Sequence, residues 1–180
     1  MKNSRATANK VILVSGCPAA GKTTLAQRIV LDTNTQPSTG SRPVHIHTDD
    51  FYTALPDLID PSLPASKTQN ENIVRQFSKV AARLAGDGHS VVVDGVIGPW
   101  MLPFVTEWLD QFYYVVLHPS LEQVTARGAA RTDQPVSELA IQKMHQAFTE
   151  AEPGFERHYL YANHPEITDC WSEERLYGRQ

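Results

Sequence analysis

The residues best suited to chemistry form one short segment near the start of the chain, Gly16-Cys17-Pro18-Ala19-Ala20-Gly21-Lys22-Thr23. It matches the pattern G-x-x-x-x-G-K-[ST] in full, between an apolar stretch and an amphipathic one. Glycines let successive backbone N–H groups point at a bound phosphate, and the dipole of the following helix favours the negative charge. Lys22 then reaches the β- and γ-phosphates, and the Thr23 hydroxyl is offered to Mg²⁺. The segment, with Thr24 after it, predicts a P-loop that binds ATP and Mg²⁺; a plain glycine turn is the alternative.

Three carboxylates follow predicted strands, at the edge where open parallel sheets bind their ligands. Asp49 and Asp50 come directly after the predicted strand Val44–Thr48, and Asp94 closes the apolar run of another predicted strand. Phosphoryl transfer to an alcohol needs a carboxylate that orients the hydroxyl and accepts its proton. Asp49 and Asp50 both fit this role, and strand alternation does not choose between them. Asp94 has the position of a Walker B acid, which predicts that it holds the Mg²⁺ hydration shell or contacts the acceptor. Acidic turns are the alternative for all three.

Two arginines indicate a lid. Arg127 and Arg131 are four residues apart and so share one face of a predicted helix. The turn Thr132–Pro135 and a helix from about Ser137 to Glu150 follow them. Because a guanidinium stays charged and binds phosphate oxygens bidentately, we interpret residues 127–150 as a lid over the nucleotide phosphates. Without a P-loop, the same pair would indicate only a solvated helix face.

The elements that must position these groups alternate along the chain. Apolar runs predict four strands, at Val11–Ser15, Val44–Thr48, Ser90–Val96 and Phe112–Leu117, and Ile167–Trp171 is the candidate for a fifth. Helical patterns cover Gly21 to Leu31, Glu71 to about Leu84, Trp100–Asp110 and 137–150. A further helix is capped by Ser120 and Gln123, and we expect it to be interrupted at Gly128 and at 132–135. The proline-rich stretch Thr53–Asn70 is expected to be a loop. This order predicts βαβ crossovers and an α/β fold of three layers, with a parallel sheet of about five strands.

Length and composition set the class of protein. The 180 residues suit one domain, spanning 1–180. Sixteen basic against twenty acidic residues give a net charge of -4 without a basic run, so a nucleic-acid partner is not expected. The two cysteines have no metal-binding spacing, and no apolar run is long enough for a signal peptide or a membrane span. These features predict a cytoplasmic protein that does not enter membranes. Oligomeric state leaves no signal in the sequence.

The motifs together resemble those of P-loop small-molecule kinases, over roughly residues 10–148. Thr48-Asp49-Asp50-Phe51-Tyr52 is similar to the Asp-x-Phe-Tyr segment of uridine-kinase-like enzymes and to the Asp-Ser-Leu segment of the chloramphenicol phosphotransferase-like group. The resemblance implies that Asp49 is the base and that Asp50 either supports the groups around it or binds a water of Mg²⁺. It also implies that the arginines close over the phosphates, as in gluconate kinase-like enzymes. The overall pattern is closest to AAA-type ATP-binding proteins, which implies a P-loop NTPase fold of the nucleoside and nucleotide kinase kind.

Other residues are open to two interpretations. His45 and His47 share one strand face, but without a third ligand nearby they indicate packing or hydrogen bonding rather than a metal site. Cys17 lies near a helix N-terminus, so a redox-sensitive thiol is the alternative to a small residue that the loop tolerates. Tyr52 and Trp100 are placed either to stack on a planar acceptor or to close the edge of the core.

These features favour an ATP- and Mg²⁺-dependent phosphotransferase that moves the γ-phosphoryl group to a hydroxyl of a small-molecule acceptor. The predicted catalytic residues are Asp49, Lys22, Arg127 and Arg131, and the predicted metal-site residues are Thr23, Asp50 and Asp94. The alternative is a nucleotide-dependent switch or binding module that hydrolyses ATP slowly. No motif identifies the acceptor.

Overall fold

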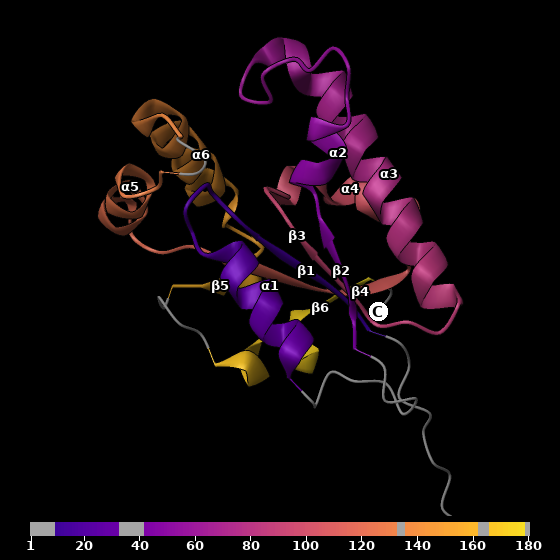
Figure 1. Ribbon diagram of the computed structural model, residues 1–180. Coiled ribbons are helices and arrows are strands. Elements are labelled where there is room, and N and C mark those ends of the chain that lie inside the picture. Colours follow the sequence, from indigo (N-terminus) through magenta and orange to yellow (C-terminus); the bar gives the residue numbers. More distant parts are fainter. Residues whose placement is uncertain (1–9, 33–41, 133–135, 162–165, 179–180) are drawn as a thin grey trace, which may run out of the picture.

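A computed structural model describes residues 10–32, 42–132, 136–161 and 166–178 of the chain. A twisted sheet forms its centre (Figure 1), with helix α1 (Lys22–Leu31) on one face and helices α3 (Lys67–Gly86) and α4 (Leu102–Val105) on the other. Helices α5 (Leu121–Ala129) and α6 (Glu138–Ala151) stand together near the carboxyl end of β1, at the left of the picture. Across the described residues, no helix combines the length and the apolarity that a membrane span requires.

The sheet confirms the predicted parallel α/β architecture. Five parallel strands lie in the order β2 (Val44–His47), β3 (Val91–Asp94), β1 (Val11–Gly16), β4 (Gln111–Leu117) and β5 (Tyr159–Leu160). Every residue of β1 and of β3 is buried, because both strands are central and are covered on both faces. This double burial explains why their sequences are continuous apolar runs rather than alternating ones. The carboxyl ends of β1, β2 and β3 meet at one edge, where the predicted site residues follow.

The C-terminal part differs from the prediction. Ile167–Trp171 is not a strand but a 3-10 helix, η5, in which Ile167 and the fully buried Cys170 lie three residues apart, as a tight helical turn requires. The fifth parallel strand is instead Tyr159–Leu160, a pair too short to give an apolar pattern. Two further 3-10 turns, η4 (Glu156–His158) and η6 (Glu173–Arg175), lead to β5 and to a sixth strand, β6 (Leu176–Gly178), which pairs antiparallel with β4.

The segment between β2 and β3 is also more helical than predicted. Strand β2 ends at His47, one residue before the predicted end at Thr48, and a short helix, α2 (Asp49–Thr53), begins directly after Thr48. The expected loop contains a 3-10 turn, η2 (Pro64–Ser66), and α3 starts at Lys67, one turn before the predicted Glu71. Residues 67–70 are all polar, so hydrophobic periodicity could not locate this first turn.

The helices after β3 and β4 agree with the prediction in place but not in length. The predicted helix Trp100–Asp110 is a 3-10 turn, η3 (Pro99–Met101), followed by the single turn of α4. Ser120 and Gln123 form the predicted capping box of α5. Gly128 does not interrupt α5: it is buried within the helix, where a Cβ atom would lie 2.3 Å from the Ile141 Cδ1 atom of α6. The glycine therefore allows close contact of α5 and α6. Residues 33–41 and 133–135, parts of two predicted loops, lie outside the described residues.

A buried histidine ties the C-terminal segment to the sheet. His158 is 1% exposed, its Nδ1 atom lies 3.0 Å from the Tyr114 carbonyl oxygen, and Arg157 Nε donates to its Nε2 atom. A neutral ring that donates from Nδ1 and accepts at Nε2 satisfies both contacts. Burial lowers the pKa of His158 to about 4.

We expect this histidine to make folding sensitive to mild acid. The unfolded ring titrates near pH 6.5, so the stabilisation is complete above that pH and is lost as the pH falls towards 4. When the pH is lowered from 7 to 5, the unfolding free energy of the parent should therefore fall. The fall should be about 2 kcal/mol smaller in His158→Gln. Urea unfolding at both pH values measures this difference, with His89→Gln, in the turn before β3, as the control. Equal losses in parent and His158→Gln would contradict the assignment.

Candidate active site

The P-loop joins β1 to α1 and surrounds a small cavity. Ala19 and Gly21 adopt φ of 63° and 96°, and this left-handed backbone curls the loop so that its N–H groups converge. Lys22 Nζ donates to the Cys17 carbonyl oxygen at 2.9 Å and so lies across the loop. The cavity, which we call the phosphate cavity, measures about 300 Å³ and is lined by Ala19, Gly21, Lys22, Thr23, Thr24, Arg127 and Arg131. The structure therefore brings the predicted P-loop and the predicted lid arginines to one cavity.

Lys22 is the centre of the charges around this cavity. Burial lowers the pKa of Lys22, whereas the nearby charges of Asp49 and Asp94 raise it and that of Arg131 lowers it. Charged residues from three other segments thus lie close enough to act on one ammonium group. A P-loop lysine with these neighbours can bind an anion while the nearby carboxylates still attract its ammonium group.

Asp94 is fully buried and accepts three side-chain hydrogen bonds. Thr23 Oγ1 donates to Oδ2 at 2.7 Å, while His45 Nε2 and His47 Nδ1 lie 2.7 Å and 3.0 Å from Oδ1. Desolvation alone would raise the pKa of Asp94, but the hydrogen bonds from His45, Thr23 and His47 outweigh it and hold the pKa below its usual value. Asp94 is therefore a carboxylate that ties α1 to β2 and β3.

The two histidines are hydrogen-bonding residues, as the sequence indicated, and their partner is Asp94. Alternation along β2 puts both rings on one face, and the parallel register sets His47 opposite Asp94. The sequence contains a His-x-His pair on one predicted strand and an aspartate at the end of another. Only the pairing of these strands in the structure could show that the histidines meet Asp94. Among the described residues, no group of three or more His, Cys, Asp and Glu side chains is arranged to hold a metal ion.

A close backbone approach holds the ends of β2 and β3 together. The N–H group of Thr48 donates to the Asp94 carbonyl oxygen at 3.0 Å. A Cβ atom on Gly95 would lie 1.9 Å from the Thr48 Oγ1 atom, so only glycine fits at that position. The residue after Thr48 is Asp49, whose Oδ2 atom lies 3.4 Å from His47 Nε2 and whose side chain is 53% exposed. Asp49 is thus accessible to a substrate, while Asp50 is the next exposed residue of α2.

The oxygen atoms of Thr23 and Asp94 suit Mg²⁺. This hard cation prefers oxygen ligands, and in phosphoryl-transfer sites it is held by one or two protein groups together with the substrate phosphates. The contact between the Thr23 hydroxyl and the Asp94 carboxylate puts two such groups beside the phosphate cavity. The donor set therefore fits the ion that a P-loop implies. Asp50 as the residue that holds a water of this ion remains a prediction.

A larger cavity lies on the other side of Pro18. It has a volume of about 530 Å³ and is enclosed by the P-loop, α2, the segment 60–62, α3, η3 and the start of α6. Its lining residues are Pro18, Tyr52, Asp60, Pro61, Ser62, Asn70, Val74, Val96, Trp100, Met101, Val136, Ser137, Ala140 and Met144. We call it the acceptor cavity. Tyr52 and Trp100, which the sequence left between two interpretations, both line it.

Cys17 does not have the character of a redox switch. The residue is fully buried, and burial raises the pKa of its thiol. A reactive cysteine needs a lowered pKa and access to solvent. Cys17 is therefore a small core residue whose carbonyl group receives Lys22.

A family comparison identifies the chain. The sequence profile of the family described as "AAA domain" matches residues 11–151, which include every predicted site residue. The chain belongs to this AAA-domain family. No curated protein sequence matches the chain.

Solved structures with this fold include small-molecule kinases. A sugar kinase from Janibacter sp. HTCC2649 has a TM-score of 0.69 at 15% identity, covering 90% of each chain. A gluconokinase from Sinorhizobium meliloti has a TM-score of 0.65 at 16% identity, covering 92% of this chain and 89% of its own. A shikimate kinase from Bacteroides thetaiotaomicron has a TM-score of 0.59 at 16% identity, covering 89% of this chain and 93% of its own. The AAA-domain chain thus has the P-loop kinase fold that the sequence predicted.

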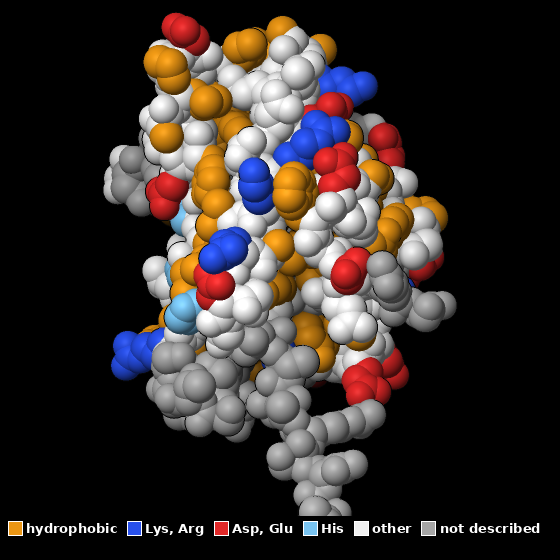
Figure 2. Space-filling model, turned by 90° about the vertical axis from the view of Figure 1, so that its right-hand side faces the viewer, with side chains coloured by type: hydrophobic (Ala, Val, Ile, Leu, Met, Phe, Trp, Pro, Cys, Tyr) orange, Lys and Arg blue, Asp and Glu red, His pale blue; other side chains and the backbone are white. Residues whose placement is uncertain are grey.

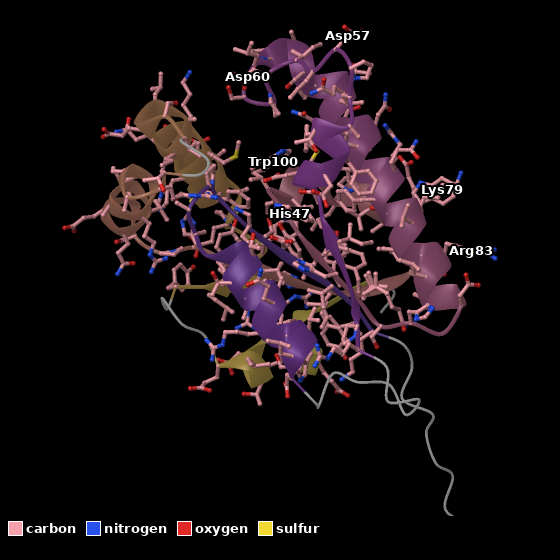
Figure 3. The ribbon with its side chains drawn as sticks, in the orientation of Figure 1. His47, Asp57, Asp60, Lys79, Arg83 and Trp100 are labelled. Atoms are coloured by element: carbon pink, nitrogen blue, oxygen red, sulfur yellow. The ribbon has the colours of Figure 1, made fainter. Side chains whose placement is uncertain are left out.

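We expect Lys22→Met to weaken ATP binding. Removing an ammonium group that pairs with phosphate oxygens in a partly buried site costs about 2 kcal/mol or more, hence at least a 30-fold rise in Kd. Isothermal titration with MgATP measures it. Lys79→Met, on the outer side of α3 (Figure 3), is the control and should leave the Kd unchanged. Equal Kd values for Lys22→Met and the parent would contradict the placement of Lys22.

We also expect His45 to stabilise the fold through Asp94. His45→Phe removes one hydrogen bond to a buried carboxylate and should lower the free energy of unfolding by about 1.5–3 kcal/mol. In an Asp94→Asn background the same change should cost less, because the charge that His45 satisfies is gone. Urea unfolding of the four proteins of this double-mutant cycle gives the coupling energy. A coupling of zero would show that His45 acts independently of Asp94.

Proposed function

We propose that this AAA-domain protein transfers the γ-phosphoryl group of ATP to a hydroxyl group of a small-molecule acceptor. The phosphate cavity would hold the triphosphate of ATP and the acceptor cavity the alcohol. Ala19 lines the first cavity and its neighbour Pro18 lines the second. The two cavities therefore meet adjacent residues of the P-loop, as a transfer between them requires.

The observation that carries the proposal is that the exposed Asp49 lies near one lining residue of each cavity, although it lines neither. Its charge acts on Lys22, which lines the phosphate cavity. It also acts on Tyr52, which lines the acceptor cavity: burial, together with the charge of Asp49, raises the pKa of Tyr52 to about 12. A carboxylate so placed is suited to accept the proton of an acceptor hydroxyl directed at the γ-phosphorus.

The proposed reaction follows from these positions. The acceptor hydroxyl donates a hydrogen bond to Asp49 and loses its proton to that carboxylate. Its oxygen forms the new bond to the γ-phosphorus as the bond between the γ-phosphorus and the β,γ-bridging oxygen breaks and ADP leaves. Lys22, Arg127 and Arg131 bind the phosphate oxygens and stabilise the negative charge that spreads over them. Thr23 and Asp94 would hold Mg²⁺, which would supply positive charge against the charge of the phosphates. Asp50 is proposed to hold a water of that ion.

Replacing the proposed base tests this mechanism. Asp49→Asn keeps the size of the side chain but cannot accept the proton, so turnover should fall by roughly 10²- to 10⁴-fold. The Kd for MgATP should change by less than about threefold, because Asn still forms hydrogen bonds and the P-loop is intact. Product formation from labelled ATP and calorimetry measure the two quantities. Full activity of Asp49→Asn would exclude Asp49 as the base.

Asp50→Asn is the matched control, since it removes a neighbouring charge from the same short helix. It should reduce turnover less than Asp49→Asn and raise the Mg²⁺ concentration needed for half-maximal rate. A panel of sugars, nucleosides, aminoglycosides and amphenicol-type alcohols, incubated with labelled ATP, identifies the acceptor class. Release of phosphate without any phosphorylated alcohol would instead favour a slow ATPase that acts as a switch.

A further inference from the structure

One wall of the acceptor cavity comes from the segment between α2 and α3. Asp60, Pro61 and Ser62 line this cavity. A second cavity of about 560 Å³, which we call the outer cavity, is lined by Ser62 and Leu63 together with residues of η2, α3, η3 and α4. Because Ser62 borders both cavities, residues 60–63 form a wall that has a cavity on each side. We call these four residues the acceptor wall.

Apolar burial does not hold this wall in place. Every residue from 56 to 65 is exposed, and none of the described side chains of this segment belongs to the hydrophobic core. Leu58 is 48% exposed, Ile59 40% and Leu63 50%. Figure 2 shows hydrophobic side chains gathered at the top of the molecule, over this segment. The position of the acceptor wall therefore depends on hydrogen bonds.

Gln69, in the first turn of α3, pairs with the backbone of Ile59. The Ile59 N–H group donates to Gln69 Oε1 at 2.9 Å, and Gln69 Nε2 donates to the Ile59 carbonyl oxygen at 2.8 Å. One side-chain amide thus satisfies both backbone groups of one residue, as the partner residue does in a hydrogen-bonded pair of antiparallel strands. Ile59 directly precedes Asp60, so Gln69 fixes the acceptor wall at its start.

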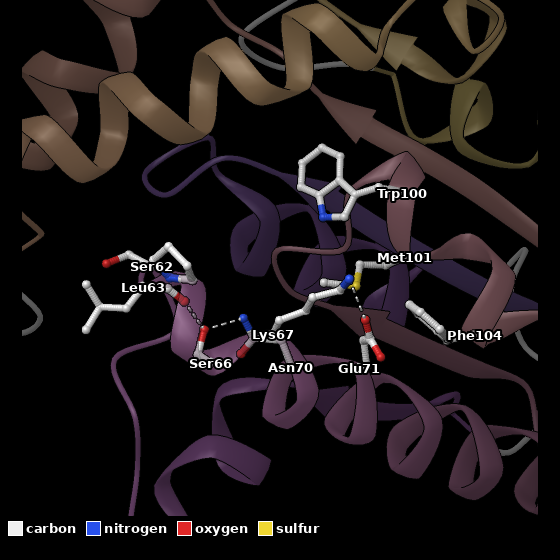
Figure 4. Close-up of a pocket in the computed structure, with 10 residues that line it drawn as sticks. Ser62, Leu63, Ser66, Lys67, Asn70, Glu71, Trp100, Met101 and Phe104 are labelled. Atoms are coloured by element: carbon white, nitrogen blue, oxygen red, sulfur yellow. Dashed lines mark hydrogen bonds and ion pairs between the residues drawn. The ribbon is translucent and has the colours of Figure 1, made fainter.

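Asn70 and Ser66 fix the rest of the wall. Asn70 Nδ2 donates to the Pro61 carbonyl oxygen at 3.0 Å and to Ser66 Oγ at 2.9 Å, and Ser66 Oγ donates to the Leu63 carbonyl oxygen at 2.7 Å. Figure 4 shows the contacts of Ser66 with Leu63 and Asn70 at the edge of the outer cavity. Asn70 lines both cavities, whereas Gln69 is not among the described lining residues of either. Gln69 is therefore an anchor that can be replaced without changing the surface that faces a ligand.

We infer that Gln69 is a positioning residue of the acceptor site. It acts through Ile59 and keeps Asp60, Pro61 and Ser62 in the wall of the acceptor cavity, without touching the acceptor itself. Its loss displaces the wall and weakens binding of the acceptor, but leaves binding of the nucleotide intact. The effect on the acceptor rests on the proposed function, whereas the effect on the wall does not.

Thiol labelling inside the acceptor cavity tests the positioning without any acceptor. Val74 lines this cavity and is 3% exposed, so Val74→Cys introduces a thiol that the wall protects. Iodoacetamide, a small neutral reagent, should label this thiol at least about tenfold faster when Gln69→Leu is added, because two hydrogen bonds to the segment are lost. The fully buried Cys170 of η5 should label at an unchanged rate in the same protein. Peptide mass spectrometry measures both rates.

Gln146→Leu is the matched control for this experiment. It makes the same substitution at an exposed position of α6, where Gln146 Nε2 donates to Glu150, and should change the Val74→Cys rate by less than about twofold. A Val74→Cys rate that Gln69→Leu leaves unchanged would overturn the inference. Equal acceleration at Cys170 would overturn it too, because the whole fold and not the wall would then have loosened.

A split between KM and kcat tests the effect on the acceptor. With the alcohol that the acceptor panel identifies, Gln69→Leu should raise KM at least about fivefold and change kcat by less than about twofold. The Kd for MgATP should also change by less than about twofold, because the described lining of the phosphate cavity contains no residue of the segment 56–70. An unchanged KM, or an equal loss in kcat, would overturn the inference while keeping the phosphotransferase. If no alcohol is phosphorylated, the phosphotransferase proposal fails, and the labelling rates alone decide whether Gln69 positions the wall.

Discussion

The carboxylate of Asp94 is removed from solvent and depends on hydrogen bonds from Thr23, His45 and His47. A buried charge is costly unless it is paired, so these contacts constrain the elements that supply them. Thr23 belongs to the first turn of α1, and the histidines belong to β2. The start of the helix behind the P-loop and the strand that leads to Asp49 are thereby held at fixed positions around one acid. The separation between the proposed base and the phosphate cavity follows from this arrangement.

The same arrangement separates two kinds of environment. On one side of the P-loop, Lys22, Arg127 and Arg131 make a cavity that is polar and positively charged. On the other side, the lining residues are mostly apolar and the charged one is Asp60. A polyanion is stable in the first environment and not in the second, because its charge would lose water without gaining cations. Under the proposed function, charge as well as shape would therefore orient the two substrates.

Sequence patterns located the parts of the site that are local in the chain. The P-loop is a contiguous motif, and the apolar runs of β1 and β3 identify central strands, so Lys22, Thr23 and Asp94 could be placed in advance. Short elements escaped prediction: α2 has five residues and β5 has two, fewer than periodicity needs. The histidine contacts to Asp94 required the order of strands β2 and β3, which no local pattern contains. The acceptor cavity draws on several distant segments and could not be assembled from the sequence at all.

The contact between Gly128 and Ile141 connects the two substrate cavities mechanically. Because a Cβ atom on Gly128 would overlap the Ile141 side chain, α5 and α6 pack too closely to shift independently. Helix α5 carries Arg127 of the phosphate cavity, and α6 carries Ala140 and Met144 of the acceptor cavity. Under the proposed function, a ligand that ordered one helix would also restrict the other and would reduce the entropic cost of binding the second ligand. Any change in acceptor affinity that the nucleotide causes through this contact would then equal the change in nucleotide affinity that the acceptor causes.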